Sequence, residues 1–359
     1  MSLPVDLIRR APTVVLHDHR DGGVQPRTVL ELEAERHEPG PGATADEIRD
    51  WFYERADSGS LVDYLRTFER TVALMQTAEN LTRVAREFVE DMVDDGVVYA
   101  ETRWAPELHV AGGLTLDAAV DAVQAGLDEG VHQAAANGRT IVVAQLLAVM
   151  RHRDAIDEIA PLVVRRLGSG VVGIDVAGPE LGHPAGRLRD GLQQVRAAGG
   201  RVTIHAGEAD GVGSIADALA CGAERIGHGV SLLEDIADGR LGPTAADTRE
   251  RGILLEVCPS SNLQTGIAMK MAEHPFGTLH RLGFRTAVSC DNRLMSRTST
   301  SRELALLSAA FGLDLADLRE ITVRSLAAGF APASVREALL RDVVLPRYAE
   351  LAGEEAARR

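Results

Sequence analysis

Residues 14–19 read VVLHDH, a short apolar run that ends in two histidines separated by one residue. Seven further runs rich in apolar and β-branched residues follow along the chain, at residues 97–106, 141–150, 171–178, 201–208, 225–230, 253–259 and 285–292. Several of them, such as IVVAQLLAV and ILLEV, are apolar without alternation, which is typical of strands that are buried on both faces. The eight runs therefore predict buried parallel strands.

Stretches with helical spacing separate these runs. One example is LTRVAREFVEDMVDDG at residues 81–96, which ends in a glycine just before the next run, as helices often do. Alternating strands and helices imply a parallel sheet, and eight such units imply a closed (β/α)8 TIM-type barrel; a doubly wound open sheet is the alternative. We expect residues 1–359 to form a single domain of this α/β class, with extra helices after the first strand and at the C-terminus.

The connection after the first predicted strand, residues 24–60, is unusually long and contains the stretch HEPGPGATADE. We expect residues 39–42 to form a loop there. A long connection of this kind lies at the active-site end of a barrel, so the segment is expected to be either part of a lid or a surface insertion. The helical patterns after the eighth run are expected to cover the outer face of the barrel.

The composition limits the choice of partners and compartment. The 359 residues include 38 basic and 53 acidic side chains, for a formal net charge of −15. This acidic balance argues against nucleic acid or an anionic membrane as a partner. No signal core and no apolar run of 18 residues or more is visible, and the three cysteines are widely spaced, so a cytoplasmic protein with reduced thiols is expected.

Polar residues of metal-ligand type stand at the carboxyl ends of the predicted strands, where side chains of a barrel share one mouth. His17 and His19 lie at positions i and i+2 of a strand, so both face the same side, while Asp18 is expected to face the other way. His205 and Asp291 stand at the ends of two other runs. Three imidazoles and one carboxylate suit Zn²⁺ with a remaining position for water, so these residues predict a zinc site.

Three more residues near the strand ends are candidates for chemistry. Glu208, three residues after His205, is expected to act as an acid in a partly dry pocket, with a carboxylate at a helix N-terminus as the alternative. His228 stands between two glycines that would clear space for a ligand, which favours a general base or electrostatic role over a structural one. Asn292 offers a donor and an acceptor to a ligand, whereas Asp291 beside it has a helix N-cap as its alternative role.

Seven segments of the chain together resemble the adenosine deaminase family of the amidohydrolase superfamily. They are, in family order, LHDHRDGG, YAETRWAP, GIDVAGPE, HAGE, RIGHGV, LEVCPSSN and SCDN. The resemblance implies hydrolytic deamination of adenosine, or of a close 6-aminopurine nucleoside, to the 6-oxo product and ammonia.

The resemblance also implies roles for individual residues. His17, His19, His205 and Asp291 match the ligands of one Zn²⁺ per chain. Glu208 matches the residue that protonates the purine ring at N1, and His228 matches the base and electrostatic partner that orients the attacking hydroxide. The matches for substrate contacts are Asp21 at the ribose 5′-hydroxyl, a backbone contact to the purine at Gly178, and also His19 and Asn292.

Three positions depart from the family pattern. Asn292 stands where many members have a second aspartate, while Arg20 and Arg297 stand where an apolar and a small residue are usual. Two guanidiniums at the mouth would favour a substrate bearing phosphate or carboxylate, unless both lie on the rim in solvent or pair with local acids. The alternative functions are therefore an amidohydrolase of a modified or anionic aminopurine nucleoside, and a purine nucleoside binder without catalysis, against which the intact ligand set argues.

Overall fold

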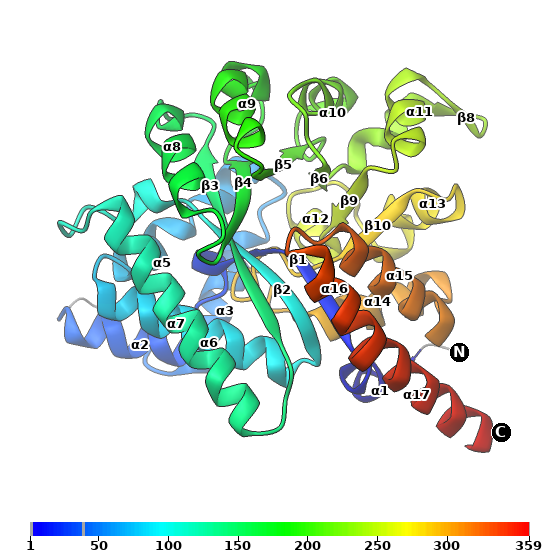
Figure 1. Cartoon of the computed structure of the whole chain (residues 1–359), viewed down its shortest axis with the longest axis horizontal. Helices are drawn as coiled ribbons and strands as arrows, with labels where there is room; N and C mark the ends of the chain where they lie inside the picture. Colours follow the sequence, from blue (N-terminus) through cyan, green and yellow to red (C-terminus); the bar gives the residue numbers. More distant parts are fainter. Residues whose placement is uncertain (1–2, 38–39, 359) are drawn as a thin grey trace.

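Eight parallel strands form the centre of the computed structural model, which describes residues 3–37 and 40–358 (Figure 1). Neighbouring strands pair in the order β1-β2-β3-β4-β5-β6-β9-β10. Their bounds are β1 Thr13–His19, β2 Val97–Trp104, β3 Val142–Met150, β4 Val171–Ala177, β5 Arg201–Ala206, β6 Arg225–His228, β9 Leu254–Val257 and β10 Arg285–Val288. Each of the eight predicted runs thus contains a strand.

The sheet closes on itself through the backbone that follows β10. The amide of His19 donates to the carbonyl of Asp291 at 2.7 Å, and the amide of Asp291 donates to the carbonyl of His17 at 3.1 Å. The expected (β/α)8 barrel is therefore confirmed, and the open doubly wound alternative is wrong. The strands stop earlier than several runs suggested because the chain leaves the extended conformation at the mouth, where His228 and Asp291 have φ angles of 60° and 61°.

Helices surround the strands in a ring (Figure 1). Thr77 and Thr115 cap two of them, because each side chain accepts a hydrogen bond from a backbone amide in the first turn. The helices that follow β2 and later strands are α7 Leu116–Ala136, α8 Ile156–Arg166, α9 Arg189–Ala197, α10 Gly211–Ala220, α11 Pro243–Glu250, α12 Pro259–Gln264, α13 Phe276–Arg281 and α14 Thr300–Phe311. A short ribbon of β7 Ile236–Ala237 and β8 Arg240–Leu241 follows β6.

The long connection after β1 is mostly helical, as the expected extra helices required. It contains α2 Pro26–Glu35, α3 Ala45–Ala56, α4 Leu61–Leu65 and α5 Phe68–Leu74, and α6 Ala78–Asp94 then leads into β2. Residues 40–42 of the expected loop lie outside helices, and Pro39 lies outside the described residues. Of the two alternatives for residues 24–60, the structure favours a surface insertion, because the helices of this connection that line the cavity at the mouth are α4 and α5, which follow this segment.

The C-terminal helices pack on the barrel as expected, and they also close its other end. They are α15 Leu315–Ala328, α16 Ala333–Leu339 and α17 Leu345–Arg358, and α15 contacts β1 and β10. Between α15 and α16, the amide of Ala331 donates to the hydroxyl of Tyr99 at 2.9 Å. The Arg225 guanidinium lies 3.6 Å from the centre of the Phe330 ring, so this segment covers the end of the barrel where the strands begin.

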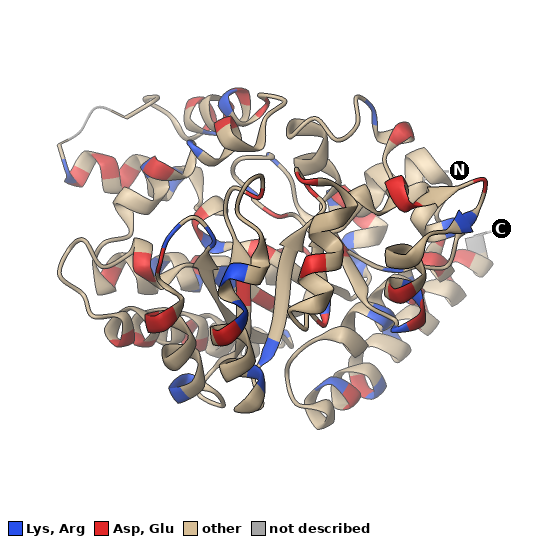
Figure 2. Ribbon diagram, turned by 90° about the horizontal axis from the view of Figure 1, so that it is seen from above, with Lys and Arg blue, Asp and Glu red and all other residues tan. Residues whose placement is uncertain are grey.

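Charges are mixed over the molecule. Figure 2 shows basic segments scattered among more numerous acidic ones along the helices. Within the described ranges, none of the helices combines the length and the apolar character that a membrane span requires. Cys221, Cys258 and Cys290 are all buried and form no disulfide.

The contact between α6 and α7 depends on a glycine. A Cβ at Gly126 would lie 2.1 Å from the carbonyl oxygen of Thr82, so the two helices approach too closely for any larger residue. We expect Gly126→Ala to lower the free energy of unfolding by about 1–3 kcal/mol through overpacking. The control is Gly353→Ala in α17, where a Cβ would meet nothing within 4 Å, so that alanine should raise stability by about 0.5–1 kcal/mol. Urea denaturation measures both, and equal stabilisation of the two variants would contradict the close packing.

Candidate active site

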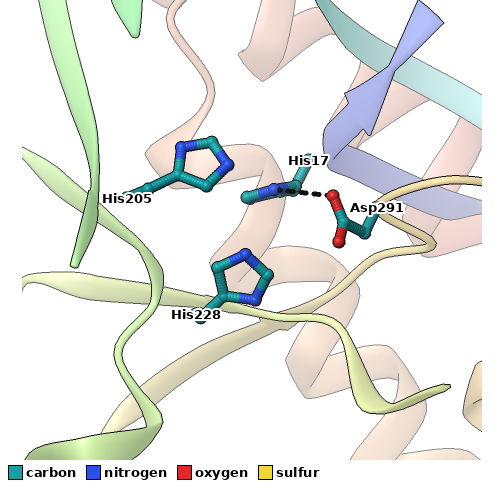
Figure 3. Close-up of side chains that lie close together, drawn as sticks. All are labelled: His17, His205, His228 and Asp291. Atoms are coloured by element: carbon teal, nitrogen blue, oxygen red, sulfur yellow. Dashed lines mark ion pairs between the residues drawn. The ribbon is translucent and has the colours of Figure 1, made fainter. Parts of the chain in front are cut away.

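Three histidines and one aspartate converge at the mouth of the barrel. His17 and His19 come from β1, His205 from β5, and Asp291 from the turn after β10. Oδ1 of Asp291 lies 3.3 Å from Nε2 of His17 and 3.4 Å from Nε2 of His19, and Nε2 of His19 lies 3.1 Å from Nε2 of His205. Figure 3 shows His17 between His205 and Asp291, with His228 completing the group drawn there. The four residues expected to bind metal therefore lie together.

Hydrogen bonds behind two of the imidazoles decide which ring nitrogen carries the proton. Nδ1 of His17 lies 2.9 Å from a carboxylate oxygen of Glu256, and Nδ1 of His205 lies 3.1 Å both from Asp175 Oδ1 and from the carbonyl of Val176. Because these partners can only accept, both Nδ1 atoms donate. The Nε2 atoms of the neutral rings then present lone pairs to one another and to a carboxylate.

This arrangement fits a divalent cation. Nitrogen ligands of Zn²⁺ stand about 2.0–2.1 Å from the metal, so two ligands of a tetrahedral site lie about 3.3 Å apart. The separations of 3.1, 3.3 and 3.4 Å between donor atoms agree with this. Nε2 of His17 is also buried without a hydrogen-bond partner. Oδ1 of Asp291 lies 3.3 Å from this nitrogen, and a cation held between the two atoms would bind both.

Glu208 and His228 lie next to this donor set. Nε2 of His228 lies 3.5 Å from Oε2 of Glu208, and both side chains are buried. Burial raises the pKa of Glu208 well above its usual range; the charges of Asp291 and Glu180 raise it further, and Arg151 opposes them. A carboxyl in this environment holds its proton near neutral pH and can donate it.

The turn that carries Glu208 is held by a residue not predicted from the sequence. The Glu180 carboxylate accepts hydrogen bonds from the amides of Gly207, Glu208 and Ala209, at 2.5, 3.0 and 2.6 Å. Glu180 therefore binds the free amides of this turn, while the carboxyl of Glu208 faces His228. The helix N-terminal role considered for Glu208 is wrong for this reason.

The glycines around His228 serve a different purpose from the one expected. A Cβ at Gly227 would lie 3.1 Å from Cε1 of His17 and 3.2 Å from Cγ of His205, so the missing side chain makes room for two imidazoles rather than for a ligand. His228 itself has a φ angle of 60°. A non-glycine residue in this region is unfavourable, and such strain is concentrated at functional sites.

The residues after β10 contact the connection that follows β1 and the start of α12. Oδ2 of Asp291 accepts from the hydroxyl of Ser261 at 2.6 Å, and the next helix, α14, is capped by Ser299 and not by Asp291. Nδ2 of Asn292 donates to the hydroxyl of Tyr64 at 2.9 Å, and its Oδ1 is buried without a partner.

A cavity of about 380 Å³ opens beside the metal-ligand group, a size that suits a small ligand. Its outer wall is formed by α4, α5 and the residues between them, and it is mostly apolar but also includes Arg66 and Glu69. Asp21 lines it with an unpartnered Oδ1, and burial raises the pKa of Asp21 to about 6 against the opposing charge of Arg20. The other lining residues include all the expected substrate contacts and both expected acid–base residues: His19, Leu61, Val62, Tyr64, Leu65, Phe68, Val72, Gly178, Glu208, His228 and Asn292.

Neither of the two arginines considered for anion binding lines this cavity. The Arg20 guanidinium is fully buried, 4.1 Å from the centre of the Trp104 ring, and is not on the rim. Arg297 pairs with Asp50 at 2.7 Å and lines a separate cavity. Neither arginine is therefore placed to contact a substrate at the metal-ligand group. The alternative expectation, pairing with a local acid, holds for Arg297.

Charged residues inside the barrel support the ligands, and the sequence reading missed them. Glu256 accepts from Arg103 at 2.7 Å and from Nε of Arg225 at 2.6 Å, and Arg103 also reaches Asp175 at 3.3 Å. All four side chains are buried. A signal was present, because Arg103, Asp175 and Glu256 stand inside the predicted strand runs and Arg225 begins one.

A closed parallel barrel with imidazoles and a carboxylate gathered at the carboxyl ends of its strands, spaced to fit one divalent ion, defines a metal-dependent hydrolase of the amidohydrolase type. The family model described as Adenosine deaminase matches residues 12–345. The chain belongs to the adenosine deaminase family, and it is a hydrolase that acts on C–N bonds.

Known relatives agree over nearly the full length. An adenosine deaminase of Mycolicibacterium gilvum is 50% identical over 362 residues, covering 98% of this chain and 100% of that protein. Adenosine deaminase 1 of Streptomyces coelicolor is 50% identical, covering 97% of this chain and 90% of that protein. Among solved structures, an Arabidopsis N6-mAMP deaminase superposes with a TM-score of 0.81 at 25% identity, covering 94% of this chain and 98% of that one.

The role of Glu180 can be tested by substitution. We expect Glu180→Gln to reduce kcat about tenfold to a hundredfold with metal content unchanged, because an amide cannot accept all three backbone hydrogen bonds that position Glu208. Glu107→Gln is the matched control, since Glu107 is a partly buried carboxylate that accepts a single amide, that of Met150, at 3.0 Å. Elemental analysis of metal and initial-rate kinetics measure the two effects. An unchanged kcat in Glu180→Gln would show that the turn at residues 207–209 positions Glu208 without the hydrogen bonds to Glu180.

Proposed function

We propose that this chain is a zinc-dependent deaminase that converts adenosine, or a close 6-aminopurine nucleoside, to the 6-oxo product and ammonia by hydrolysis. One observation supports this proposal above the others. A donor set that fits a divalent ion lies beside Glu208, a buried carboxyl whose pKa is raised by burial, and both face the same cavity. Addition of water to purine C6 requires an activated nucleophile on one side of the ring and an acid on the other.

His17, His19, His205 and Asp291 would hold the Zn²⁺, one ion per chain. Borderline nitrogen donors with a single carboxylate suit zinc, and the ion supplies Lewis-acid activation of water at neutral pH. Glu256 and Asp175 keep the ring nitrogens of His17 and His205 available by accepting from their Nδ1 atoms.

The remaining site residues act on the substrate. Glu208 donates its proton to purine N1 as the nucleophile adds, and His228 stands beside it on the side of the metal ligands. Asp21, a buried acceptor that lacks a partner, can receive the ribose 5′-hydroxyl, and the backbone at Gly178 lines the purine side. Asn292 retains a second amide hydrogen beyond the one given to Tyr64, so it can donate to purine N7.

The buried carboxyl of Asp21 favours a nucleoside, which has a 5′-hydroxyl, over a substrate that carries an anionic group there. A phosphate at the 5′ position would meet this buried carboxyl. The Arabidopsis structure named as an N6-mAMP deaminase has the same fold and is named for a nucleotide. The choice between a nucleoside and a nucleotide in this chain therefore depends on the side chains that line the cavity, such as Asp21. We also propose that residues 1–359 act as one domain, in the cytoplasm, on a small molecule and not on nucleic acid or a membrane; buried free cysteines suit a reducing compartment.

A substrate panel tests the proposed reaction. Zinc-replete protein should release ammonia from adenosine with a kcat/KM at least about a hundredfold above that for AMP, the equivalent of roughly 2.8 kcal/mol of discrimination. Ammonia release and the change in purine absorbance are measured together. A preference for AMP would contradict the role of Asp21, and binding of adenosine without turnover would support the non-catalytic alternative.

Two substitutions separate metal binding from acid catalysis. His205→Ala should lose metal and activity together, because a three-residue set no longer encloses the ion. Glu208→Gln should keep the metal yet lose turnover on the order of a hundredfold or more, as expected when a general acid is removed. Metal analysis and kinetics of both variants decide the matter, and full activity in Glu208→Gln would exclude the acid role.

A further inference from the structure

A buried chain of hydrogen bonds ends at His228. Nδ2 of Asn262, in α12, lies 3.1 Å from Nδ1 of His228, and Oδ1 of Asn262 lies 3.2 Å from Nε2 of His274, just before α13. The backbone amide of Phe276 donates to Nδ1 of His274 at 3.1 Å. The side chains of His228, Asn262 and His274 are at most 2% exposed. Asn262 and His274 are therefore linked to the site through His228.

The backbone amide of Phe276 determines which group donates in each hydrogen bond of this network. A peptide N–H can only donate, so Nδ1 of His274 must be the acceptor, and the neutral ring carries its proton on Nε2. That proton is donated to Oδ1 of Asn262, which fixes the orientation of the amide. Nδ2 of Asn262 must then donate to Nδ1 of His228. The remaining ring nitrogen of neutral His228, Nε2, carries the proton and faces Glu208 at 3.5 Å.

We propose that Asn262 and His274 are positioning residues that hold His228 as the neutral tautomer with its proton on Nε2. This inference rests on the proposed deamination for its catalytic meaning, although the tautomer itself does not depend on turnover. Burial lowers the pKa of His274 to about 4, so that ring stays neutral, as the chain requires, across the neutral range. The anchor is the main chain, which no rearrangement of side chains reverses.

The tautomer restricts what His228 can do. Its Nδ1 lone pair is engaged by Asn262, and its Nε2 carries a hydrogen, so neither nitrogen is free to take a proton. Of the two roles that the family resemblance gave His228, the network favours a hydrogen-bond donor to the attacking oxygen over a general base. The same proton keeps Nε2 of His228 from binding a cation, which leaves His19 to complete the ligand set.

Histidine ring NMR of the zinc-loaded protein measures this directly. With ¹⁵N-labelled histidine, the ring spectrum distinguishes a proton on Nε2 from one on Nδ1, and His228→Asn identifies the His228 signals among the 11 histidines. We expect the parent protein to show the Nε2–H form at neutral pH. A parent spectrum with the proton on Nδ1 would overturn the inference, whatever the variants do.

Substitutions at Asn262 test the control over the tautomer. Asn262→Asp places an acceptor against Nδ1 of His228, so His228 should gain a proton on Nδ1, and kcat should fall about tenfold to a hundredfold with KM near the parental value. Asn262→Leu removes the donor and should leave a mixture of tautomers. An unchanged tautomer in Asn262→Asp contradicts the proposal.

Substitutions at His274 separate positioning from packing. His274→Gln keeps an amide donor for Asn262 and should retain most of kcat, whereas His274→Phe, which has no donor, should lose about as much as Asn262→Leu. His109→Phe is the matched control, because His109 is a buried histidine that bonds the carbonyl of Met75 outside this chain. Equal losses in the phenylalanine and glutamine variants of His274 would indicate packing alone.

The two proposals fail in different ways. A parent protein that shows the Nε2–H form but releases no ammonia from adenosine contradicts the proposed function and leaves the positioning role intact. An active parent with the proton on Nδ1 contradicts the positioning role alone.

Discussion

The carboxylate of Glu256 is the interaction on which the site depends. It is fully buried and accepts from Arg103, Arg225 and Nδ1 of His17, at 2.7, 2.6 and 2.9 Å. A buried charge is costly unless it is paired and hydrogen bonded, so this carboxylate is stable only when strands β1, β2, β6 and β9 are in register. The hydrogen bonds of Glu256 therefore both join these strands inside the barrel and orient the ring of His17.

The same principle recurs around the mouth, where groups that face the cavity are oriented by partners behind them. Asp175 orients His205, Ser261 orients Asp291, and Glu180 holds the backbone that carries Glu208. The strained backbone at His228 and Asp291 persists because these contacts determine its conformation. The site is consequently preformed, and binding of a substrate requires little reorganisation of the polar residues.

Much of this could be predicted from the sequence because the signals are local. Apolar runs define strands, and the spacing of His17 and His19 places both on one side of β1. The missed features depend on contacts between distant segments. Nothing local to Glu180 indicates that it accepts the amides of residues 207–209, and nothing local to His274 indicates its hydrogen bond to Asn262 in α12. The role of the connection after β1 stayed open between lid and surface insertion, because which of its helices reach the mouth depends on how this connection folds back.

The sequence by itself determined the barrel and the chemical type of the site, because hydrophobic periodicity selects strands and helices, and the carboxyl ends of parallel strands share one mouth. Only the tertiary structure decided which nitrogen carries the proton in His17, His205 and His228, which buried carboxyl has a raised pKa, and that Arg20 and Arg297 stand apart from the cavity. Those properties depend on burial and on partners brought together from distant parts of the chain, and no local pattern encodes them.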